Sequence, residues 1–292
     1  MKKIDETTLM NRPQANRLLG YPDDARLLIL NADDFGMCHA VNEAIRRALQ
    51  QGVLRSTTLM APCPWAPHAM HFLRDHPEIA FGIHLTVLSE WPGYRWGPLT
   101  DRSKTPSLLD QAGHFQNFEQ RHSTLDHINL AELEVEFRAQ IESVLAAGLH
   151  PTHLDWHALR IDGRQEITDL MLRLAREYGL ALRVRGRAAI ARVQSQGLPC
   201  NDDDFLDSYA LDPVDQPACY HQLLRALPVG LHEWAVHPGL ENAELLAIEG
   251  DSRHVRQRDF DFLMSPAAQE IVRQEGIVLL DYRALQAVWR RY

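Results

Sequence analysis

The sequence predicts an α/β protein whose core is a closed or nearly closed parallel β/α barrel. Short apolar runs alternate with amphipathic segments from Leu27 to the C-terminus, without internal repeats or low-complexity tracts. This alternation is typical of a parallel sheet covered by helices. About seven strand candidates fall within residues 27–292, which fits one barrel better than two domains. An open doubly wound sheet is the alternative architecture.

The composition is that of an ordinary globular protein, with 292 residues of which 45% are hydrophobic and 24% are charged. A formal net charge of −9 argues against nucleic acid and anionic membrane surfaces as partners. The chain contains neither a bilayer-spanning apolar run nor the apolar core of a secretory signal. Its four cysteines are far apart, which favours reduced thiols and a cytoplasmic location and argues against a zinc-thiolate site.

The expected elements begin after a polar leader, residues 1–26, which lacks periodicity and is predicted to be loosely ordered. A helix follows the first strand because apolar residues recur on one helical face before Gly52, namely Val41, Ala44, Ile45, Ala48 and Leu49. The elements expected up to residue 88 are a strand at 27–30, this helix, a strand at 56–61, a helix at 65–77 and a strand at 79–87.

Residues 89–128 interrupt the alternation with glycine, proline and aromatic residues, and are predicted to form a long inserted loop. The next helix, at 130–148, rests on five apolar residues at helical spacing: Leu130, Leu133, Phe137, Ile141 and Leu145. The remaining expected elements are a strand at 151–157, a helix at 167–178, a strand at 180–184, a helix at 216–227, a strand at 233–239, one long helix at 260–276 and a strand at 277–282. Residues 27–292 are therefore expected to form one domain.

Polar side chains with metal-binding or acid–base chemistry stand where the expected strands end. In chain order they are Asp33, Asp34, His84, His153, Asp155 and His237. The C-terminal ends of barrel strands converge on one face, where active sites are built. Two imidazoles and one carboxylate form a three-ligand set for Zn²⁺ or a similar divalent ion, with a position left open. A cation would also relieve the repulsion between the two adjacent carboxylates.

Each of these residues has a structural interpretation when it is taken alone. A histidine at a strand end is often held by hydrogen bonds, and an aspartate after a strand is a common helix N-cap. Asp34 fits such a cap, and Asp155 fits a turn. These interpretations would have to hold independently at every strand end, which favours the joint site.

Several motifs resemble the YdjC-like carbohydrate deacetylases, also called the ChbG/HpnK group. They are "NADDFG", "STTLM", "GIHLTV", "PTHLDWH", "LALRV", "VHPG" and "RDFDFLMS…EGIVLLDYR", in this order from about residue 27 to the C-terminus. The resemblance implies an irregular, partly open β/α barrel that holds one divalent metal ion and removes acetyl groups from N-acetylated sugars.

The resemblance also implies roles for individual residues. Asp34, His84 and His153 match the metal ligands, Asp33 matches the catalytic base, and His237 matches a histidine of the same pocket. Many members follow "THLD" with serine and a run of histidines. Here Trp156, His157, Ala158 and Leu159 stand at that place, which weakens the transfer of substrate identity.

The hypothesis for catalysis assigns the general acid to His237, which would protonate the departing sugar nitrogen. Asp155, His157, Arg183 and Arg185 are assigned to substrate binding or to hydrogen bonds behind the ligands. In particular, Asp155 would orient His237 or His157. The two arginines are two positions apart on one expected strand and share a face, so that one tethers Asp33 or binds a substrate oxygen. Exposed cations are the alternative.

The aromatic residues of the 89–128 loop are Trp91, Tyr94, Trp96, Phe115 and Phe118. Stacking on sugar rings and anchoring a homodimer are equally supported for them. The expected partner is a small N-acetylated carbohydrate, and the expected cofactor is one Zn²⁺ or Mg²⁺ ion. Two alternative functions stay open: a metal-dependent lyase or isomerase for a sugar or keto acid on the same barrel, and a sugar-binding relative without catalysis.

Overall fold

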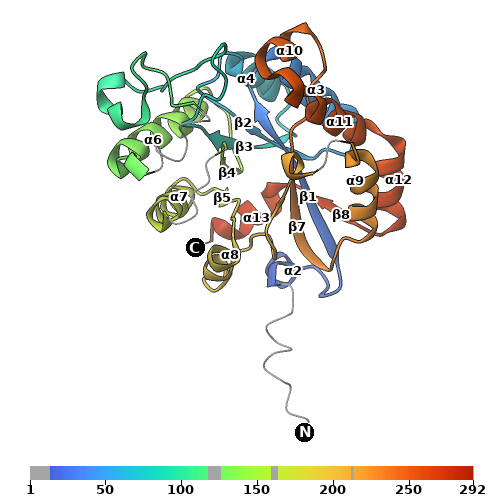
Figure 1. The fold of residues 1–292 in the computed structure, drawn as a ribbon. Helices are drawn as coiled ribbons and strands as arrows, with labels where there is room; N and C mark the ends of the chain where they lie inside the picture. Colours follow the sequence, from blue (N-terminus) through green and yellow to red (C-terminus); the bar gives the residue numbers. More distant parts are fainter. Residues whose placement is uncertain (1–13, 118–125, 159–163, 212–213, 292) are drawn as a thin grey trace.

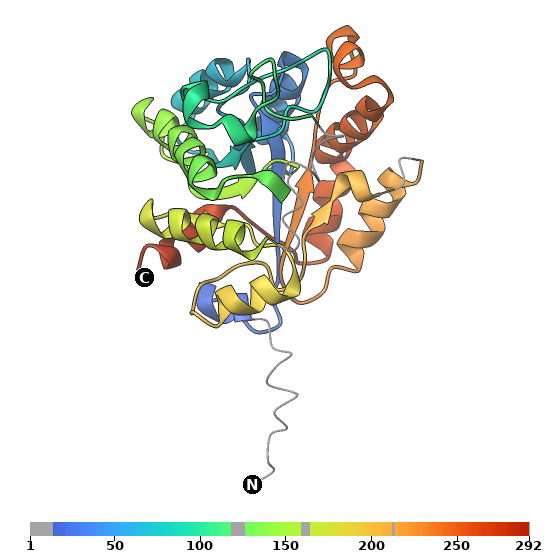
Figure 2. The same ribbon diagram turned by 60° about the vertical axis from the view of Figure 1, so that its left-hand side comes forward.

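The protein folds around one curled parallel sheet with helices packed on its outside (Figures 1 and 2). The structure is a computed structural model that describes residues 14–117, 126–158, 164–211 and 214–291. The strand order is β5-β4-β3-β2-β1-β7-β6, and β8 also pairs with β1. The strands are β1 (Arg26–Phe35), β2 (Ser56–Leu59), β3 (Ala80–Leu85), β4 (His153–Trp156), β5 (Ala181–Leu182), β6 (Leu206–Asp207), β7 (Gly230–Val236) and β8 (Val278–Leu280).

The sheet forms half a barrel. Its end strands, β5 and β6, pair with β4 and β7 respectively and, within the described residues, do not pair with each other. This confirms the irregular, partly open parallel barrel and shows that the closed form is not adopted. The C-terminal ends of the parallel strands therefore still meet on one face, as the active-site prediction requires.

Strand β1 is the centre of the sheet and is buried almost from end to end. It pairs along residues 26–32 with β7, so its other edge serves two strands. The first half of that edge pairs with β8 at residues 27–29, and the second half pairs with β2 from Asn31 onward. The first and last strands of the sheet are thus neighbours.

The helices cover the outer face of the sheet, and their buried residues join one continuous apolar core with the strands. They are α2 (Gln14–Leu19), α3 (His39–Gln51), α4 (Ala66–Asp75), α6 (Leu130–Ala146), α7 (Gln165–Glu177), α8 (Arg187–Gln194), α9 (Gln216–Arg225), α10 (Ala243–Glu249), α11 (Arg253–Met264), α12 (Pro266–Gln274) and α13 (Tyr282–Trp289). None of the described helices combines the length and apolar character needed to cross a lipid bilayer.

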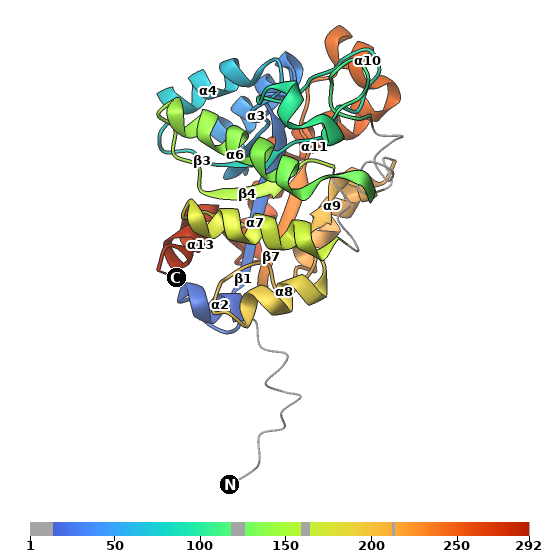
Figure 3. The same ribbon diagram turned by 90° about the vertical axis from the view of Figure 1, so that its left-hand side faces the viewer.

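The described part of the predicted leader is ordered, which differs from expectation. Helix α2 lies beside α8 and α13 (Figure 3). Its first two backbone N–H groups, at Gln14 and Ala15, donate to the carboxylate of Asp202 at 3.1 and 3.2 Å. Ala15 and Asn16 are fully buried. A polar segment is held here by capping and by a few buried side chains, which leave no periodic pattern.

The long helix predicted at 260–276 is wrong, because the structure divides it into α11 and α12. Ser265 ends the first helix and caps the second, where its side chain accepts a hydrogen bond from the backbone N–H of Ala268. Pro266 occupies the first position of α12. Proline has no N–H to continue the preceding helix and suits a first turn, so the break follows from these two residues.

The loop predicted at 89–128 contains two short 3₁₀ turns, at Arg102–Lys104 and Pro106–Leu108. Trp96 and Phe115 are buried in the core, so neither is exposed for sugar stacking or a dimer contact. Trp91 and Tyr94 are half-buried, and Phe118 lies outside the described residues.

Candidate active site

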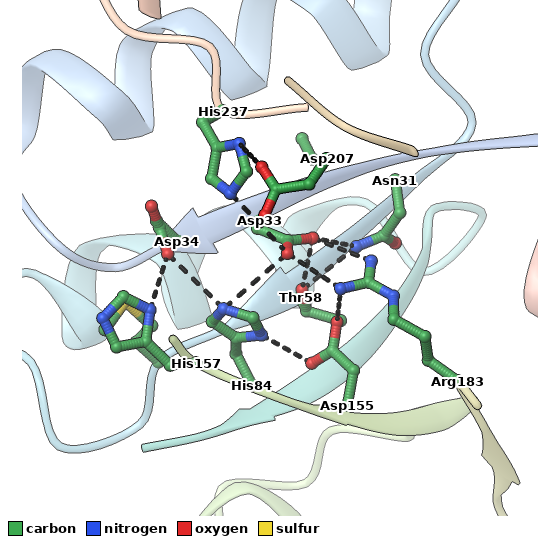
Figure 4. Close-up of polar contacts among 12 residues, drawn as sticks. Asn31, Asp33, Asp34, Thr58, His84, Asp155, His157, Arg183, Asp207 and His237 are labelled. Atoms are coloured by element: carbon green, nitrogen blue, oxygen red, sulfur yellow. Dashed lines mark hydrogen bonds and ion pairs between the residues drawn. The ribbon is translucent and has the colours of Figure 1, made fainter. Parts of the chain in front are cut away.

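The site begins with an irregularity near the end of β1. Successive side chains of a regular strand point to opposite faces. Here the register against β2 shifts between Ala32 and Phe35, and Asp34 adopts a left-handed φ of 70°. The bulge turns both carboxylates toward one histidine. Asp33 Oδ2 lies 3.8 Å and Asp34 Oδ1 lies 3.4 Å from His84 Nε2 (Figure 4).

Asp33 accepts hydrogen bonds through both of its oxygens, most of them through Oδ1. Oδ1 accepts hydrogen bonds from Asn31 Nδ2 at 2.8 Å, Arg183 Nη2 at 2.8 Å and Thr58 Oγ1 at 3.4 Å. Oδ2 accepts from Arg183 Nη1 at 2.8 Å and otherwise faces His84 and His237. Burial opposes ionisation, but the Arg183 guanidinium holds the pKa of Asp33 well below its usual range. Asp33 is therefore ionised, with Oδ2 turned into the site.

Asp34 also divides its oxygens between two tasks. Oδ2 accepts a hydrogen bond at 2.8 Å from Arg256, a buried arginine of α11. Oδ1 faces His84 Nε2 and accepts from His157 Nδ1 at 3.0 Å. Although burial opposes ionisation, Arg256 and the two histidines keep the pKa of Asp34 well below its usual range. Asp34 Oδ1 thus lies between the imidazoles of His84 and His157, where a ligand of all three residues could bind.

His84 is oriented by a carboxylate on its far side. Its Nδ1 lies 2.6 Å from Asp155 Oδ1, and the second oxygen of Asp155 lies 2.8 Å from Arg183 Nη1. Burial disfavours the charged ring, but Asp155 and Asp33 raise the pKa of His84 to about 9. The prediction that Asp155 orients His237 or His157 is wrong. Asp155 on β4 is the register partner of His84 on β3, which puts these two side chains together.

His157 repeats this arrangement from the other side of Asp34. Its Nδ1 faces Asp34, while its Nε2 lies 3.0 Å from the carboxylate of Glu90. Burial favours the neutral ring, but Glu90 and Asp34 raise the pKa of His157 to about 10. Each imidazole therefore has one nitrogen against a carboxylate and the other turned to Asp34 Oδ1. Such a carboxylate behind a histidine is the usual support of a metal-binding imidazole.

His153 is not placed with Asp34 and His84, so the structure does not support it as a ligand. Its ring stacks on Tyr282 with centroids 3.6 Å apart, and its Nδ1 lies 2.9 Å from Thr152 Oγ1. Burial holds the pKa of His153 well below its usual range, so the ring is neutral. Residues 153, 155 and 157 point the same way by strand alternation, but at different depths in the barrel. His157, the uppermost, takes the place predicted for His153.

His237 follows β7 and reaches the site from the side opposite His157. Its Nε2 lies 3.9 Å from Asp33 Oδ2, and its ring centroid lies 4.7 Å from that of Tyr209. Its Nδ1 makes a 2.8 Å hydrogen bond with Ser208 Oγ. His237 thus lies next to Asp33 at the site.

The two arginines of the predicted pair differ in their hydrogen-bond partners, although both lie over the ring of Phe205. Arg183 is buried and binds both oxygens of Asp33, as one of the two alternatives predicted, and its Nε donates to Glu233 at 2.7 Å. The described contact of Arg185 is with the ring of Phe205, whose centroid lies 5.6 Å away. Strand β5 ends at Leu182, and beyond it the guanidinium groups of Arg183 and Arg185 lie over the same ring of Phe205, at 5.2 and 5.6 Å from its centroid.

The residues present fit a divalent metal ion. Donor atoms of Asp34, His84 and His157 all lie within 4.8 Å of one another, and all three residues are buried. Asp33, His84 and Asp155 form a second such group, but His84 Nδ1 and Asp155 already bond each other in it. The first group offers two supported imidazoles and one carboxylate oxygen, which is a ligand set for zinc or a similar ion.

A third group, His39, Glu43 and His68, lies on α3 and α4. The amide of Asn42 is oriented by the backbone, since its oxygen accepts from Gly36 N and its nitrogen donates to Trp65 O. The same nitrogen lies 3.1 Å from His68 Nδ1 and must donate to it. The proton of His68 is then on Nε2, so neither ring nitrogen is free to bind a metal.

Sequence reasoning missed several residues that complete the site. Glu90, Tyr209, Glu233 and Arg256 are among them, together with Ser208 behind His237. One signal was available for Arg256. It lies on the buried face of α11 with Asp259 and Leu263, at helical spacing, where two charged residues have no structural reason to be unless they are paired.

The chain is similar to known proteins along most of its length. The family model described as YdjC-like protein matches residues 27–274. A carbohydrate deacetylase of Enterococcus faecalis is 30% identical over 88% of this chain and 97% of its own length. A chitooligosaccharide deacetylase of Serratia marcescens is 27% identical over 89% of this chain and 99% of its own.

One solved structure is similar over nearly the whole fold. It is a protein of Enterococcus faecalis V583 provisionally named a cellobiose-phosphate cleavage protein. It superposes with a TM-score of 0.75 at 29% sequence identity, over 89% of this chain and 99% of its own. The half-barrel described above is thus an architecture that an experimental structure also adopts.

Proposed function

Because the chain belongs to the YdjC-like protein family, we propose that it is a metal-dependent carbohydrate deacetylase, which hydrolyses the amide of an N-acetylated sugar or oligosaccharide. One observation carries the proposal. The ligand group of Asp34, His84 and His157 lies beside an ionised carboxylate, Asp33, whose Oδ2 is turned into the site. A binding protein without catalysis has no need of such a base.

The proposed ligands are Asp34 Oδ1, His84 Nε2 and His157 Nδ1, because these atoms face one another while their opposite atoms are bound elsewhere. A divalent ion held there would lower the pKa of a water molecule and polarise the acetyl carbonyl. Two imidazoles among three ligands favour Zn²⁺, and Mg²⁺ is the alternative.

The roles of the other side chains follow from the atoms that they turn into the site. Asp33 Oδ2 accepts a proton from the attacking water, and the water oxygen bonds to the carbonyl carbon. His237 Nε2, which lies 3.9 Å from Asp33 Oδ2, donates a proton to the sugar nitrogen as the C–N bond breaks. Acetate and a free amino sugar leave. Arg183 keeps Asp33 in place by binding both of its oxygens.

The central test is the release of acetate from N-acetylated glucosamine oligomers by the full-length protein. Activity should disappear with EDTA and return with Zn²⁺ or Mg²⁺, whichever the protein holds. Carbon-bond cleavage, or isomerisation without acetate, would instead support the lyase or isomerase. Cleavage of cellobiose phosphate would point to the activity suggested by the name of the similar solved structure.

The ligand set has its own test, because substitutions of His153 and His157 should have opposite effects on metal binding. His157→Ala should lose bound metal, measured by elemental analysis, together with activity. His153→Asn should keep the metal, since His153 stacks on Tyr282 away from Asp34. Asp33→Asn should keep the metal and lower kcat by about 10²-fold or more, as expected for a general base. If His153→Asn lost the metal and His157→Ala kept it, the ligands would instead be Asp34, His84 and His153.

A further inference from the structure

The two proposed histidine ligands are supported by different parts of the fold. His84 lies in β3, and the carboxylate behind it, that of Asp155, lies in the neighbouring strand β4. His157 follows the end of β4, and the carboxylate behind it, that of Glu90, belongs to the inserted loop. The structure describes this loop over residues 89–117. The side chain of one ligand is therefore supported within the sheet, and that of the other is supported from the loop.

The contact between Glu90 and His157 is close and sheltered from water. Glu90 Oε2 lies 3.0 Å from His157 Nε2, and the two side chains are 14% and 5% exposed. Both atoms are buried, and within the described residues neither has a hydrogen-bond partner beyond this contact. A metal ion on Nδ1 would leave the proton of the neutral ring on Nε2, where Glu90 is the acceptor. The ring also makes a T-shaped contact with Trp96, a second residue of the loop, with centroids 6.4 Å apart.

Ser89, the residue before Glu90, joins three parts of the loop. It is completely buried, and its backbone N–H donates to the backbone oxygen of Gln116 at 2.9 Å. Its Oγ accepts a hydrogen bond from the backbone N–H of Trp96 at 2.9 Å. The beginning, middle and end of the described loop are thus tied together next to Glu90. Opening the loop would break these two hydrogen bonds and withdraw Glu90 from His157.

We propose that Glu90 is a positioning residue through which the inserted loop holds His157 at the metal, so that metal binding and the folded state of the loop stabilise each other. This inference rests on the ligand set of the proposed function and does not depend on which sugar is the substrate. Coupling between two sites is reciprocal, so a loop that raises metal affinity is itself stabilised by the metal by the same factor. The competing explanation is that Trp96 and the backbone of His157, whose N–H donates to Leu85 O at 3.0 Å, hold the ring without Glu90.

The first test is the affinity of the full-length protein for Zn²⁺, measured by competition with a chromophoric chelator. Glu90→Ala should bind Zn²⁺ about 10- to 100-fold more weakly than the wild type, which is the usual loss when the support of a metal-bound histidine is removed. Glu90→Gln keeps an oxygen that accepts from His157 Nε2, so it should recover part of this loss. Glu78→Ala is the matched control, because Glu78 lies 3.0 Å from His76 Nδ1 on the surface. It should leave the affinity unchanged.

The second test follows the loop itself by amide hydrogen exchange, which is independent of turnover. In the wild type, saturating Zn²⁺ should slow exchange at the N–H groups of Ser89 and Trp96 by about the factor that separates the Zn²⁺ affinities of wild type and Glu90→Ala. In Glu90→Ala, Zn²⁺ should slow these amides by less than about threefold. A merely structural contact would not make loop opening depend on the metal.

Two results would overturn the inference. One is an unchanged Zn²⁺ affinity in Glu90→Ala, and the other is wild-type exchange at Ser89 and Trp96 that does not respond to Zn²⁺. A His157→Ala variant with wild-type Zn²⁺ affinity would refute the ligand set and the inference together. A protein that bound Zn²⁺ with the expected coupling but released no acetate would refute the proposed function alone.

Discussion

At the scale of single residues, a strained backbone position gives two neighbouring carboxylates different tasks. Asp34 has a left-handed φ of 70°, which costs a non-glycine residue about 1–2 kcal/mol. The bulge places Asp34 Oδ1 among the imidazoles and leaves Asp33 on the Arg183 side. Sequence motifs predicted that both residues belong to the site. The bulge that separates their roles has no signature in the sequence.

The two histidines of β4 and the loop after it show the limit of strand periodicity. Residues 153, 155 and 157 share a face by alternation, so the pattern predicts that all three point into the barrel. A strand rises about 3.3 Å per residue, which separates positions 153 and 157 by about 13 Å along it. Asp155 is the register partner of His84, so the second histidine ligand must come from a position after Asp155, nearer the C-terminal end of the strand. Depth within the barrel, rather than residue type, decides between the two histidines.

Gly82 is predicted to be essential for the packing of His153. A Cβ at position 82 would lie 2.6 Å from three atoms of the His153 ring, and the ring cannot retreat because Tyr282 stacks on it. Gly82→Ala should therefore lower the free energy of unfolding by about 1–3 kcal/mol, as overpacked cores do. Urea denaturation followed by circular dichroism measures the change.

Gly93→Ala is the control for this prediction. A Cβ at position 93 would meet no atom within 4 Å, so its effect should stay within about 0.5 kcal/mol. Equal effects of the two substitutions would contradict the packing argument.

At the scale of elements, charged residues join the outer faces of α6 and α7. Glu134 of α6 lies 2.7 Å from Arg173 of α7 and 2.9 Å from Arg138 of its own helix. Arg138 also reaches Glu177 of α7 at 2.6 Å. Helical spacing predicted both helices and their buried faces. It did not predict these ion pairs between α6 and α7, because such pairs depend on which helices are neighbours.

Glu134 is predicted to make stability depend on pH in the acid range. Hydrogen bonds from Arg173 and the nearby charge of Arg138 lower the pKa of Glu134 from 4.5 to about 2. A lowered folded-state pKa stabilises the protein above pH 4.5, and this contribution is lost as the pH falls from 4.5 toward 2. Because the pairs are partly exposed, we expect about 1 kcal/mol in total.

The measurement compares urea unfolding of wild type and Glu134→Gln at pH 7 and at pH 3.5. The variant should be less stable at pH 7, and the difference should shrink at pH 3.5. A difference of the same size at both pH values would show that the carboxylate charge of Glu134 does not stabilise the folded protein.

At the scale of the whole molecule, the order of the expected elements followed from the alternation of patterns, and the degree of closure did not. Helices α2, α8, α10 and α13 and strand β6 were not expected. Strands β5 and β6 are each two residues long, too short to leave a clear pattern, and they are the ends of the sheet. Whether a barrel closes is decided by such end strands. The motifs that resemble the family supplied what periodicity could not, namely the partly open form.

Asp202 is predicted to fasten the beginning of the chain to the barrel. Its carboxylate accepts from the backbone of Gln14 and Ala15, from Gln194 Nε2 at 2.8 Å and from Leu231 N at 2.9 Å. Asp202→Ala leaves these donors without their acceptor, so the free energy of unfolding should fall by about 1–3 kcal/mol. Thermal or urea unfolding measures the loss, and acetate release at 25 °C should be unchanged. Unaltered stability would show that water replaces the carboxylate without cost.

The division of one edge of β1 between β2 and β8 has a consequence for synthesis on the ribosome. The segment that pairs with the first half of this edge, Val278–Leu280, is translated about 250 residues after β1. Until then, the nascent polypeptide carries an apolar ribbon whose hydrogen-bonding groups await a partner, which is a site for mispairing. Pairing along this edge of β1 is therefore complete only after residues 278–280 have left the ribosome, and dependence on chaperones should be greatest until then.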